Sequence, residues 1–385
     1  MTGPSPDRAG RATRRKRRPS GAVTIKEIAA LSQVSSATVT RALQGHPRVR
    51  PETRARVEQA AEALGYRPNH AARTLATGAS KTIGLLLPST GDRYWGEVVE
   101  GIEDAADDAG YSVLLATSHG DAARSRRMLD LLLSKRVDGM VIAARREVEE
   151  ALTHAELPVA LVRVGPDAEL DDGDVEAVRT LPDDRLAGWL EGRRLGDLAP
   201  GVIGFDDVSA ATLAVEHLVG LGHRRLAFVG AGNRRSAALR VAGFRQSTGR
   251  AGVESAAVVA SSDRLADSHA AALDLLGAPE RPTGIVAYDD MVALGAIRAA
   301  RTLGLRVPEQ VSVVGIDDID VAAFLEPPLT TVRQPKREIG RLAAIALFEA
   351  LGSGTPSPGR ALRGELIVRG STAPPPGHDA ADEAR

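Results

Sequence analysis

Paired carboxylates follow two apolar runs in the second half of the chain. Asp289 and Asp290 come directly after "TGIVAY", and Asp317 and Asp318 come after "VSVVGI". At the end of a buried strand, a carboxylate can accept hydrogen bonds from the hydroxyl groups of a ligand. It can instead cap the helix that follows, and for Asp290 and Asp318 the sequence leaves both roles open.

The motifs of common enzyme chemistries are missing or incomplete. The run "VGAGNRR" resembles the start of a dinucleotide-binding loop, but Arg235 occupies its third glycine position. There is no G-x-S-x-G elbow and no P-loop. His217 and His223 are six residues apart, which does not place them on one helix face, and the chain has no cysteine. We therefore expect no enzyme activity, no metal and no cofactor.

The stretch "LSQVSSATVTRAL" near the N-terminus offers a different chemistry. Thr24 and Glu27 have the spacing of a capping box, which predicts a first helix at about 25–31. After a break at Ser32-Gln33, Ser35 can cap a second helix that runs to about residue 43. The outward face of this second helix would carry Ser36, Ala37, Thr40 and Arg41.

A third helix is expected to begin at Pro51 and to end at Gly65. Two short helices joined by a tight turn and braced by a third are the outline of a helix-turn-helix DNA reader. Small side chains let the second helix enter the major groove, and Arg41 can reach a guanine edge or a phosphate. The alternative is an ordinary small helical bundle.

Charge is divided unevenly along the 385 residues. Residues 1–80 contain 15 Lys+Arg and 5 Asp+Glu, a balance of +10. Because the formal net charge of the whole chain is -1, the remaining residues have a balance of -11. A basic head on an acidic body indicates a polyanion-binding module joined to a part that should not bind polyanions. The segment "RATRRKRRPS" fits a solvated tail as well as it fits an arm on nucleic acid.

Nothing in the sequence indicates a membrane or secreted protein. No run of about 18 apolar residues exists, and no apolar segment follows the arginine-rich start as a secretory signal requires. Without cysteines there is no disulfide framework either. A cytoplasmic location is the expectation.

From Lys81 onward, short apolar runs such as "TIGLLLP", "VDGMVIAA" and "RRLAFVG" alternate with amphipathic helices. This alternation is typical of a doubly wound α/β fold with parallel sheets, in which ligands bind at the carboxyl ends of the strands.

Several specific motifs occur in an order that resembles the lactose-repressor (LacI/GalR-type) family of bacterial transcription regulators. They are "VSSATVTRAL", "LGYRPN", "ARTL", "TIGLLLP", "GLGHRRLAFVG", "PPLTTVRQP" and "RGSTAPP". The resemblance covers most of the chain. It implies a helix-turn-helix head on a two-lobed body like a periplasmic sugar-binding protein.

For the head, the resemblance places Ser36 and Ala37 at the family's base-reading pair and Arg41 at its base-contacting arginine. The segment "RPNHAARTLATG" matches a hinge helix that inserts a leucine, here Leu75, into the minor groove. Such an apolar wedge can unstack a base step and bend the duplex. The expected DNA contacts are Thr24, Ser35, Ser36, Ala37, Thr38, Thr40, Arg41, Asn69, Ala72, Arg73 and Leu75.

For the body, the resemblance places Arg240 and Asp317 at effector-contacting positions and Tyr288 where an asparagine is common. A guanidinium opposite a carboxylate suits a polyhydroxylated ligand. We therefore expect a small-molecule effector, a sugar or sugar derivative; a non-sugar ligand, a partner protein or no ligand are the alternatives. The expected effector contacts are Tyr94, Trp95, Arg240, Tyr288, Asp289 and Asp317.

Three features depart from the family pattern. Gln33 replaces a usual glycine, so the turn either changes shape or holds Gln33 in a left-handed conformation at a cost of about 1 kcal/mol. "SSDRLADS" offers Arg264 and Leu265 where the family often has a sugar-stacking aromatic. Residues 165–203 do not match the short link that the family usually has here. They can be interpreted as a surface insertion or as an altered lobe or dimer contact.

The sequence thus predicts a cytoplasmic, nucleoid-associated repressor that binds pseudo-palindromic double-stranded operator DNA and no membrane. The resemblance implies a homodimer, and the tail "APPPGHDAADEAR" carries no leucine heptad for the tetramer seen in some relatives. The predicted parts are a disordered basic tail (1–22), the helix-turn-helix domain (23–68), a hinge (69–80), an effector-binding and dimerisation domain (81–372) and a disordered tail (373–385). Within 81–372, the first lobe is expected to comprise 81–204 and 333–359, and the second 205–332 and 360–372.

Overall fold

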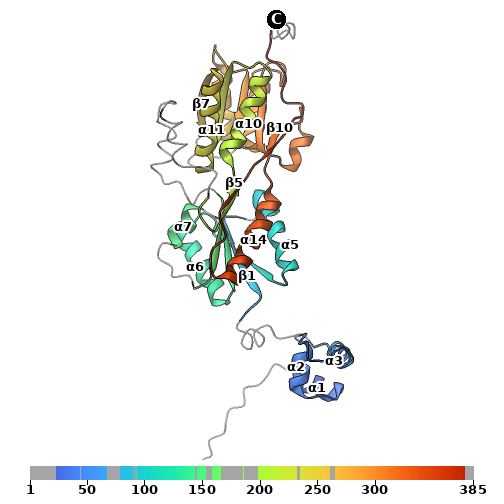
Figure 1. The fold of residues 1–385 in the computed structure, drawn as a ribbon. Helices are drawn as coiled ribbons and strands as arrows, with labels where there is room; N and C mark the ends of the chain where they lie inside the picture. Colours follow the sequence, from blue (N-terminus) through green and yellow to red (C-terminus); the bar gives the residue numbers. More distant parts are fainter. Residues whose placement is uncertain are drawn as a thin grey trace, which may run out of the picture. The chain divides into compact units, whose positions relative to one another are not determined.

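The chain forms two compact units, Met1–Ala79 and Ser80–Arg385, here called the head and the body (Figure 1). The computed structural model describes residues 23–43, 45–66, 79–89, 91, 93–143, 145–152, 158–165, 185, 198–231, 235–260 and 265–377. Both expected tails, apart from 373–377, and the expected hinge residues Asn69, Ala72, Arg73 and Leu75 lie outside this part. So does most of the unusual segment 165–203.

The described residues of the head form the three helices that were expected. They are α1 (Ile25–Ser32), α2 (Ser36–Leu43) and α3 (Pro51–Ala63). The Glu27 carboxylate accepts hydrogen bonds from the backbone N–H and the hydroxyl of Thr24, at 2.6 and 2.9 Å. Ile28, Val39 and Val57, one from each helix, are fully buried together. This small shared core fixes the helices against one another.

The turn between α1 and α2 keeps the left-handed shape that glycine would favour. Gln33 has φ 54° and ψ 42° and follows the last residue of α1. Of the two alternatives for this turn, the structure therefore has the left-handed conformation.

The first lobe of the body is a six-stranded parallel sheet in the order β11-β5-β4-β3-β1-β2. Helices α5 and α14 pack on one face, and α6 and α7 lie on the other (Figure 1). The strands are β1 (Thr82–Leu87), β2 (Ser112–Thr117), β3 (Gly139–Ala143), β4 (Ala160–Val164), β5 (Val202–Phe205) and β11 (Arg360–Leu362). The helices are α5 (Arg93–Asp108), α6 (Ala122–Ser134), α7 (Arg146–Leu152) and α14 (Lys336–Ser353).

The second lobe repeats this design in the order β12-β10-β9-β8-β6-β7, with β12 antiparallel at the edge. Its strands are β6 (Arg225–Ala231), β7 (Glu254–Ala260), β8 (Gly284–Ala287), β9 (Ser312–Asp317), β10 (Thr330–Arg333) and β12 (Glu365–Ile367). Its helices are α10 (Asp207–Gly220), α11 (Arg235–Ala251), α12 (Leu265–Gly277), α13 (Asp290–Thr302) and the 3₁₀ helix η2 (Asp320–Phe324). The doubly wound α/β fold is confirmed, although the second sheet is not wholly parallel.

The chain crosses between the lobes three times, after β5, after β10 and between β11 and β12. The expected lobe boundary at residue 360 is wrong, because Arg360–Leu362 pairs with β5 of the first sheet. The second lobe resumes only at β12. A strand of only three residues does not reveal from its sequence which sheet edge it joins, since that depends on pairing with a distant strand, here Arg360 with Ile203.

Helices α5 and α14 approach so closely that their backbones touch. A Cβ at Gly340 would lie 2.0 Å from the carbonyl oxygen of Val98, and one at Gly101 would lie 1.9 Å from that of Arg337. Only glycine fits at these crossing points. The contact fixes α14, which follows the second crossing, against α5.

Candidate nucleic-acid interface and ligand site

The exposed face of α2 carries the residues that the sequence assigns to base reading. Ser36, Ala37, Thr40 and Arg41 are all exposed, whereas Val39 and Ala42 point into the core of the head. The face is therefore shallow apart from one long cationic side chain. This shape lets a helix backbone approach the floor of a DNA major groove.

Three further residues of the expected DNA-binding set have structural partners in the head. The hydroxyl of Thr24 donates to Glu27, and Ser35 accepts from the backbone N–H of Thr38 at 3.1 Å. The hydroxyls of Ser35 and Thr38 also lie 2.9 Å apart. These side chains cap α1 and α2, so they set the position of the face formed by Ser36 and Arg41.

In the body, the carboxyl ends of the strands bring together side chains from both lobes. Tyr94 lies on α5 of the first lobe, while Arg240 lies on α11 and Asp317 ends β9 of the second. Burial raises the pKa of the Tyr94 hydroxyl above its ordinary value, and the charges of Asp207 and Asp317 raise it further. Arg240 and Arg145 act on it in the opposite direction. We call this group of residues the strand-end cluster.

The Arg240 side chain is held in place by contacts with Asp207 and Tyr288. It is buried, and its Nε lies 2.6 Å from Oδ1 of Asp207, which is also buried. Its Nη1 donates to the carbonyl oxygen of Tyr288, and the guanidinium stacks 4.6 Å from the Tyr288 ring centroid. The carboxylate that pairs with Arg240 is thus Asp207 and not Asp317. Tyr288 is fixed in turn by its hydroxyl, 2.9 Å from Oγ of Ser236.

The Asp317 carboxyl group is largely enclosed and has both acidic and basic neighbours. Burial raises its pKa well above the ordinary value; Asp289 and Asp290 raise it further, whereas Arg240 and Lys336 oppose the rise. Its Oδ1 accepts a hydrogen bond from the side-chain amide of Gln334. A carboxyl group in this state can both donate and accept hydrogen bonds.

The other strand-end carboxylates have structural partners. Asp289 caps α13, because its Oδ1 accepts from the backbone N–H of Val292 at 2.7 Å. Asp290 is buried, accepting from the hydroxyl of Thr331 at 2.5 Å and from the N–H of Ile319 at 2.8 Å. Of the roles that the sequence left open for Asp290, the structure shows neither a helix cap nor an exposed ligand contact.

Tyr94 and Trp95 pack edge to face, with ring centroids 5.0 Å apart. Tyr94 is half-buried, while Trp95 is buried in the core beneath it. The indole N–H of Trp95 has no hydrogen-bond acceptor among the described residues. The paired aromatics thus offer one apolar ring surface and one unsatisfied donor.

Sequence reasoning missed three polar members of the strand-end cluster. Asp207 begins α10 after β5, so the "FDD" that follows an apolar run was a usable signal. Gln334 and Lys336 had no such signal in the sequence, because they lie at the second lobe crossing. Lys336 is almost fully buried and its Nζ lies 2.8 Å from Oε1 of Glu97 on α5. A lysine at the start of a helix opposes the helix dipole, and this ion pair offsets the unfavourable placement.

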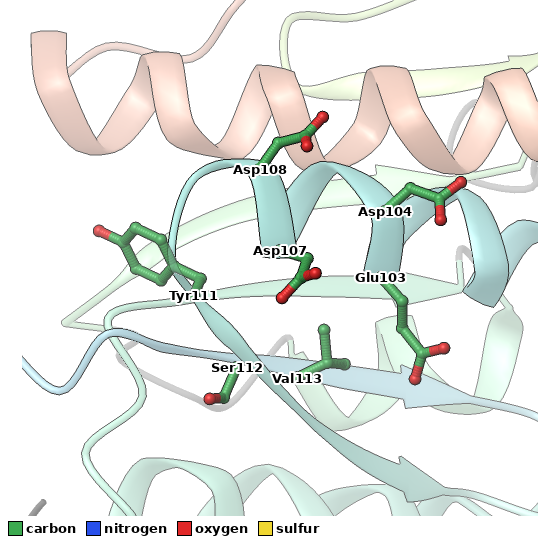
Figure 2. A pocket seen from close by; sticks show the side chains of 7 residues that line it. All are labelled: Glu103, Asp104, Asp107, Asp108, Tyr111, Ser112 and Val113. Carbon is green, nitrogen blue, oxygen red and sulfur yellow. The ribbon is translucent and has the colours of Figure 1, made fainter.

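A cavity of about 450 Å³ lies elsewhere in the first lobe, beside the C-terminal half of α5 (Figure 2). Its lining comprises Glu103, Asp104, Asp107, Asp108, Tyr111, Ser112 and Val113. Arg337 already pairs with Asp104 at 2.6 Å. The described residues contain no group of three or more acidic or histidine side chains arranged to hold a metal ion.

A helix-turn-helix head joined to a two-lobed α/β body, with polar side chains gathered where the lobes' strands end, defines a ligand-binding DNA reader. Residues 24–69 match the family described as "Bacterial regulatory proteins, lacI family", and residues 215–372 match the "Periplasmic binding protein-like domain". The repressor CytR of Escherichia coli K12 is 33% identical over 355 residues, 91% of this chain and 96% of its own. The chain therefore belongs to the LacI family of bacterial transcription regulators.

Other relatives agree with this assignment. The ribose operon repressor of Haemophilus influenzae is 30% identical, covering 85% of this chain and 92% of its own. The lac repressor dimer bound to operator and the anti-inducer ONPF matches with TM-score 0.76 and 26% identity, over 91% of this chain and 99% of that one. The complex of the regulator CelR with cellobiose matches with TM-score 0.62 and 26% identity, over the same shares.

These relatives are transcriptional repressors, which confirms the expectations of a DNA-binding regulator and of no enzyme activity. No helix in the described part of the chain combines the length and the apolar character that crossing a bilayer requires.

Proposed function

We propose that the protein is a dimeric repressor whose affinity for a pseudo-palindromic operator is set by a small molecule bound at the strand-end cluster. The observation that supports this most is the convergence of Tyr94 from the first lobe with Arg240 and Asp317 from the second. A ligand that contacts both lobes favours one lobe arrangement over another. Such a regulator works in the cytoplasm, at the nucleoid.

A sugar or sugar derivative is the effector class that the cluster fits best. Asp317 offers a carboxyl group to hydroxyls, and the Tyr94 ring offers a face on which a sugar ring can stack. The expected contacts remain Tyr94, Trp95, Arg240, Tyr288, Asp289 and Asp317. Cellobiose in the CelR complex is consistent with this class. The unsatisfied Trp95 indole N–H calls for an acceptor oxygen on a ligand or a water molecule.

On the DNA side, we propose that α2 reads bases through Ser36, Ala37 and Arg41, with Thr40 beside them. Thr24, Ser35 and Thr38 contact the DNA phosphate backbone and hold α2 in place. Asn69, Ala72, Arg73 and Leu75 complete the interface as a hinge that widens the minor groove. The tails and the division into hinge and effector domain follow the family pattern.

The DNA-binding part is tested by comparing two arginines of the head in the full-length protein. Arg41→Ala should lower operator affinity about 5- to 150-fold, a loss of roughly 1–3 kcal/mol, and should relax sequence preference. Arg56→Ala removes an equal charge from the exposed side of α3. It should weaken binding to all sequences alike, if at all. Equal effects of the two variants on sequence preference would contradict base reading by Arg41.

The effector part is tested by identifying the small molecule that co-purifies with the protein, or one found by screening, and titrating it into operator complexes. Asp317→Asn should keep operator binding and lose the response. Asp107→Asn, the same change in the carboxylate-lined cavity, is the matched control and should respond normally. Arg240→Ala is unsuitable, because it would leave Asp207 buried without its cation. A response that survives in Asp317→Asn but not in Asp107→Asn would move the sensor to the cavity.

A further inference from the structure

Two consecutive residues at the strand-end cluster have positive φ angles, which residues other than glycine rarely adopt. Asp317 has φ 130° and Asp318 has φ 53°. Such a conformation is unfavourable for a residue with a side chain, and it persists only where the surrounding structure holds it. The strain coincides with the carboxylate that we assign to the effector.

Asp318 is held by two arginines. Its Oδ1 lies 2.6 Å from Nη2 of Arg369, and its Oδ2 lies 2.7 Å from Nε of Arg333. Its side chain is 8% exposed. Burial alone would raise the pKa of the Asp318 carboxyl, but hydrogen bonds and charge from Arg369 and Arg333 outweigh it and hold the pKa below its ordinary value. Asp318 is therefore a firmly ionised anchor.

The two arginines are themselves fixed by neighbouring chain segments. Arg369 donates from Nη1 to the carbonyl oxygen of Leu329 at 2.8 Å and from its backbone N–H to Thr330 at 2.9 Å. Arg333 ends β10 and pairs in register with Asp317. Arg333 directly precedes the second lobe crossing, whereas Arg369 follows β12 and lies beside the start of β10. The anchor thus joins the end of β9 to β10 and to the segment after β12.

We propose that Asp318, clamped by Arg369 and Arg333, is a positioning residue that keeps the preceding backbone strained and so presents the Asp317 carboxyl to the effector. The two carboxylates have separate partners: Asp318 binds the arginines, and Asp317 faces Gln334, Arg240 and Lys336. The inference rests on the proposed role of Asp317 in effector binding. It adds that the clamp, which does not touch the cluster's cations, controls how Asp317 is displayed.

Two substitutions of Asp318 separate the clamp from the strain. Asp318→Ala and Asp318→Gly remove the same carboxylate, so their electrostatic effects on Asp317 are equal. They differ because glycine adopts φ 53° freely and alanine does not. In alanine the backbone should relax and move Asp317 out of its buried position, whereas glycine should retain it.

The measurement is an NMR pH titration of the ¹³C-labelled Asp317 carboxyl in the full-length protein, identified by its absence in Asp317→Asn. In Asp318→Ala the Asp317 pKa should fall toward its ordinary value by at least one unit relative to Asp318→Gly. Crystal structures of the two variants should show the Asp317–Gln334 hydrogen bond lost in alanine and kept in glycine. Equal pKa values together with an intact hydrogen bond in both would overturn the proposal.

Arg369→Gln supplies an independent variant with a distinct sign. Loss of a positive charge would by itself raise the pKa of Asp317, whereas release of the carboxyl group lowers it, so a fall supports positioning and a rise or no change opposes it. Arg341→Gln, which breaks the exposed pair with Glu338, is the control and should leave the titration unchanged. If the clamp variants behave as expected but Asp317→Asn still responds to effector, the proposed function fails while the positioning role stands.

Discussion

At the scale of single residues, the turn between α1 and α2 holds one residue in an unfavourable backbone conformation. Gln33 occupies a left-handed conformation that glycine adopts without penalty. The capping of α1 and the three-helix core hold it there. The residue is exposed, so its side chain contributes little to the packing that fixes it.

Replacing Gln33 with glycine should therefore stabilise the head by up to about 1 kcal/mol. Gln33→Val should destabilise it, because a β-branched residue tolerates a positive φ poorly. Thermal unfolding of a peptide comprising the head, followed by circular dichroism, measures both. A lower midpoint for Gln33→Gly than for the wild type would contradict the strain argument.

A second residue prediction concerns pH. Burial raises the pKa of Asp290 from an ordinary value of 3.8 to about 6, despite hydrogen bonds from Thr331 and Ile319 that favour the charged form. The folded state thus binds a proton that the unfolded state has lost between about pH 4 and pH 6. In that window the free energy of unfolding falls as pH rises, by about 3 kcal/mol in total.

Asp290→Asn imitates the neutral carboxyl and should remove this contribution. Its free energy of unfolding should exceed that of the wild type by up to about 3 kcal/mol at pH 7, and by little at pH 4. Urea unfolding across this pH range measures the difference. A difference between variant and wild type that stays constant with pH would show that Asp290 does not titrate there.

At the scale of elements, the crossing of α5 and α14 is a contact that a single added methyl group would disturb. Gly340 is buried against the backbone of Val98, and a Cβ there meets a carbonyl oxygen that cannot move independently. The helices also share the ion pair between Lys336 and Glu97. They carry Tyr94 and the second lobe crossing, so their contact positions part of the ligand site.

Gly340→Ala should destabilise the body by roughly 1–3 kcal/mol or more, because the helices must separate. Gly352→Ala is the matched control on the same helix, where an added Cβ meets nothing within 4 Å. It should stabilise by up to about 1 kcal/mol through helix propensity. Chemical unfolding of the two variants measures the contrast, and similar values for both would refute close packing at the crossing.

At the scale of the whole molecule, charge and function are divided between the two compact units. The net positive charge lies before Lys81, and the net negative charge lies from Lys81 onward. A chain that begins at Lys81 should keep the body's fold and lose operator binding. Electrophoretic mobility shift with operator DNA, beside circular dichroism of the same sample, checks both, and retained sequence-specific binding would sink the assignment of DNA affinity to the head.

Linkage constrains the intact regulator as well. If the effector weakens operator binding by some factor, the operator must weaken effector binding by the same factor. The structural route is the spacing of the two heads in a dimer, since recognition helices must lie about 34 Å apart to enter successive major grooves. Titrations of effector with and without saturating operator measure this factor.

Features that depend on local periodicity and on the order of motifs could be predicted from the amino-acid pattern. Capping at Thr24 and Ser35, the helix start at Pro51 and the alternation of apolar runs with helices all act over a few residues. They identified the head and the α/β body, whereas Arg240 and Asp317 were placed through the family resemblance that the order of motifs carries.

Which distant groups meet could be seen only in the folded chain. Asp207 pairs with Arg240, Lys336 is buried against Glu97, and Arg360–Leu362 joins the first sheet. Arg369 reaches Asp318 across about 50 residues. Ion pairs and edge-strand pairing depend on distances through space, and no local pattern encodes which of many charged side chains will be buried together.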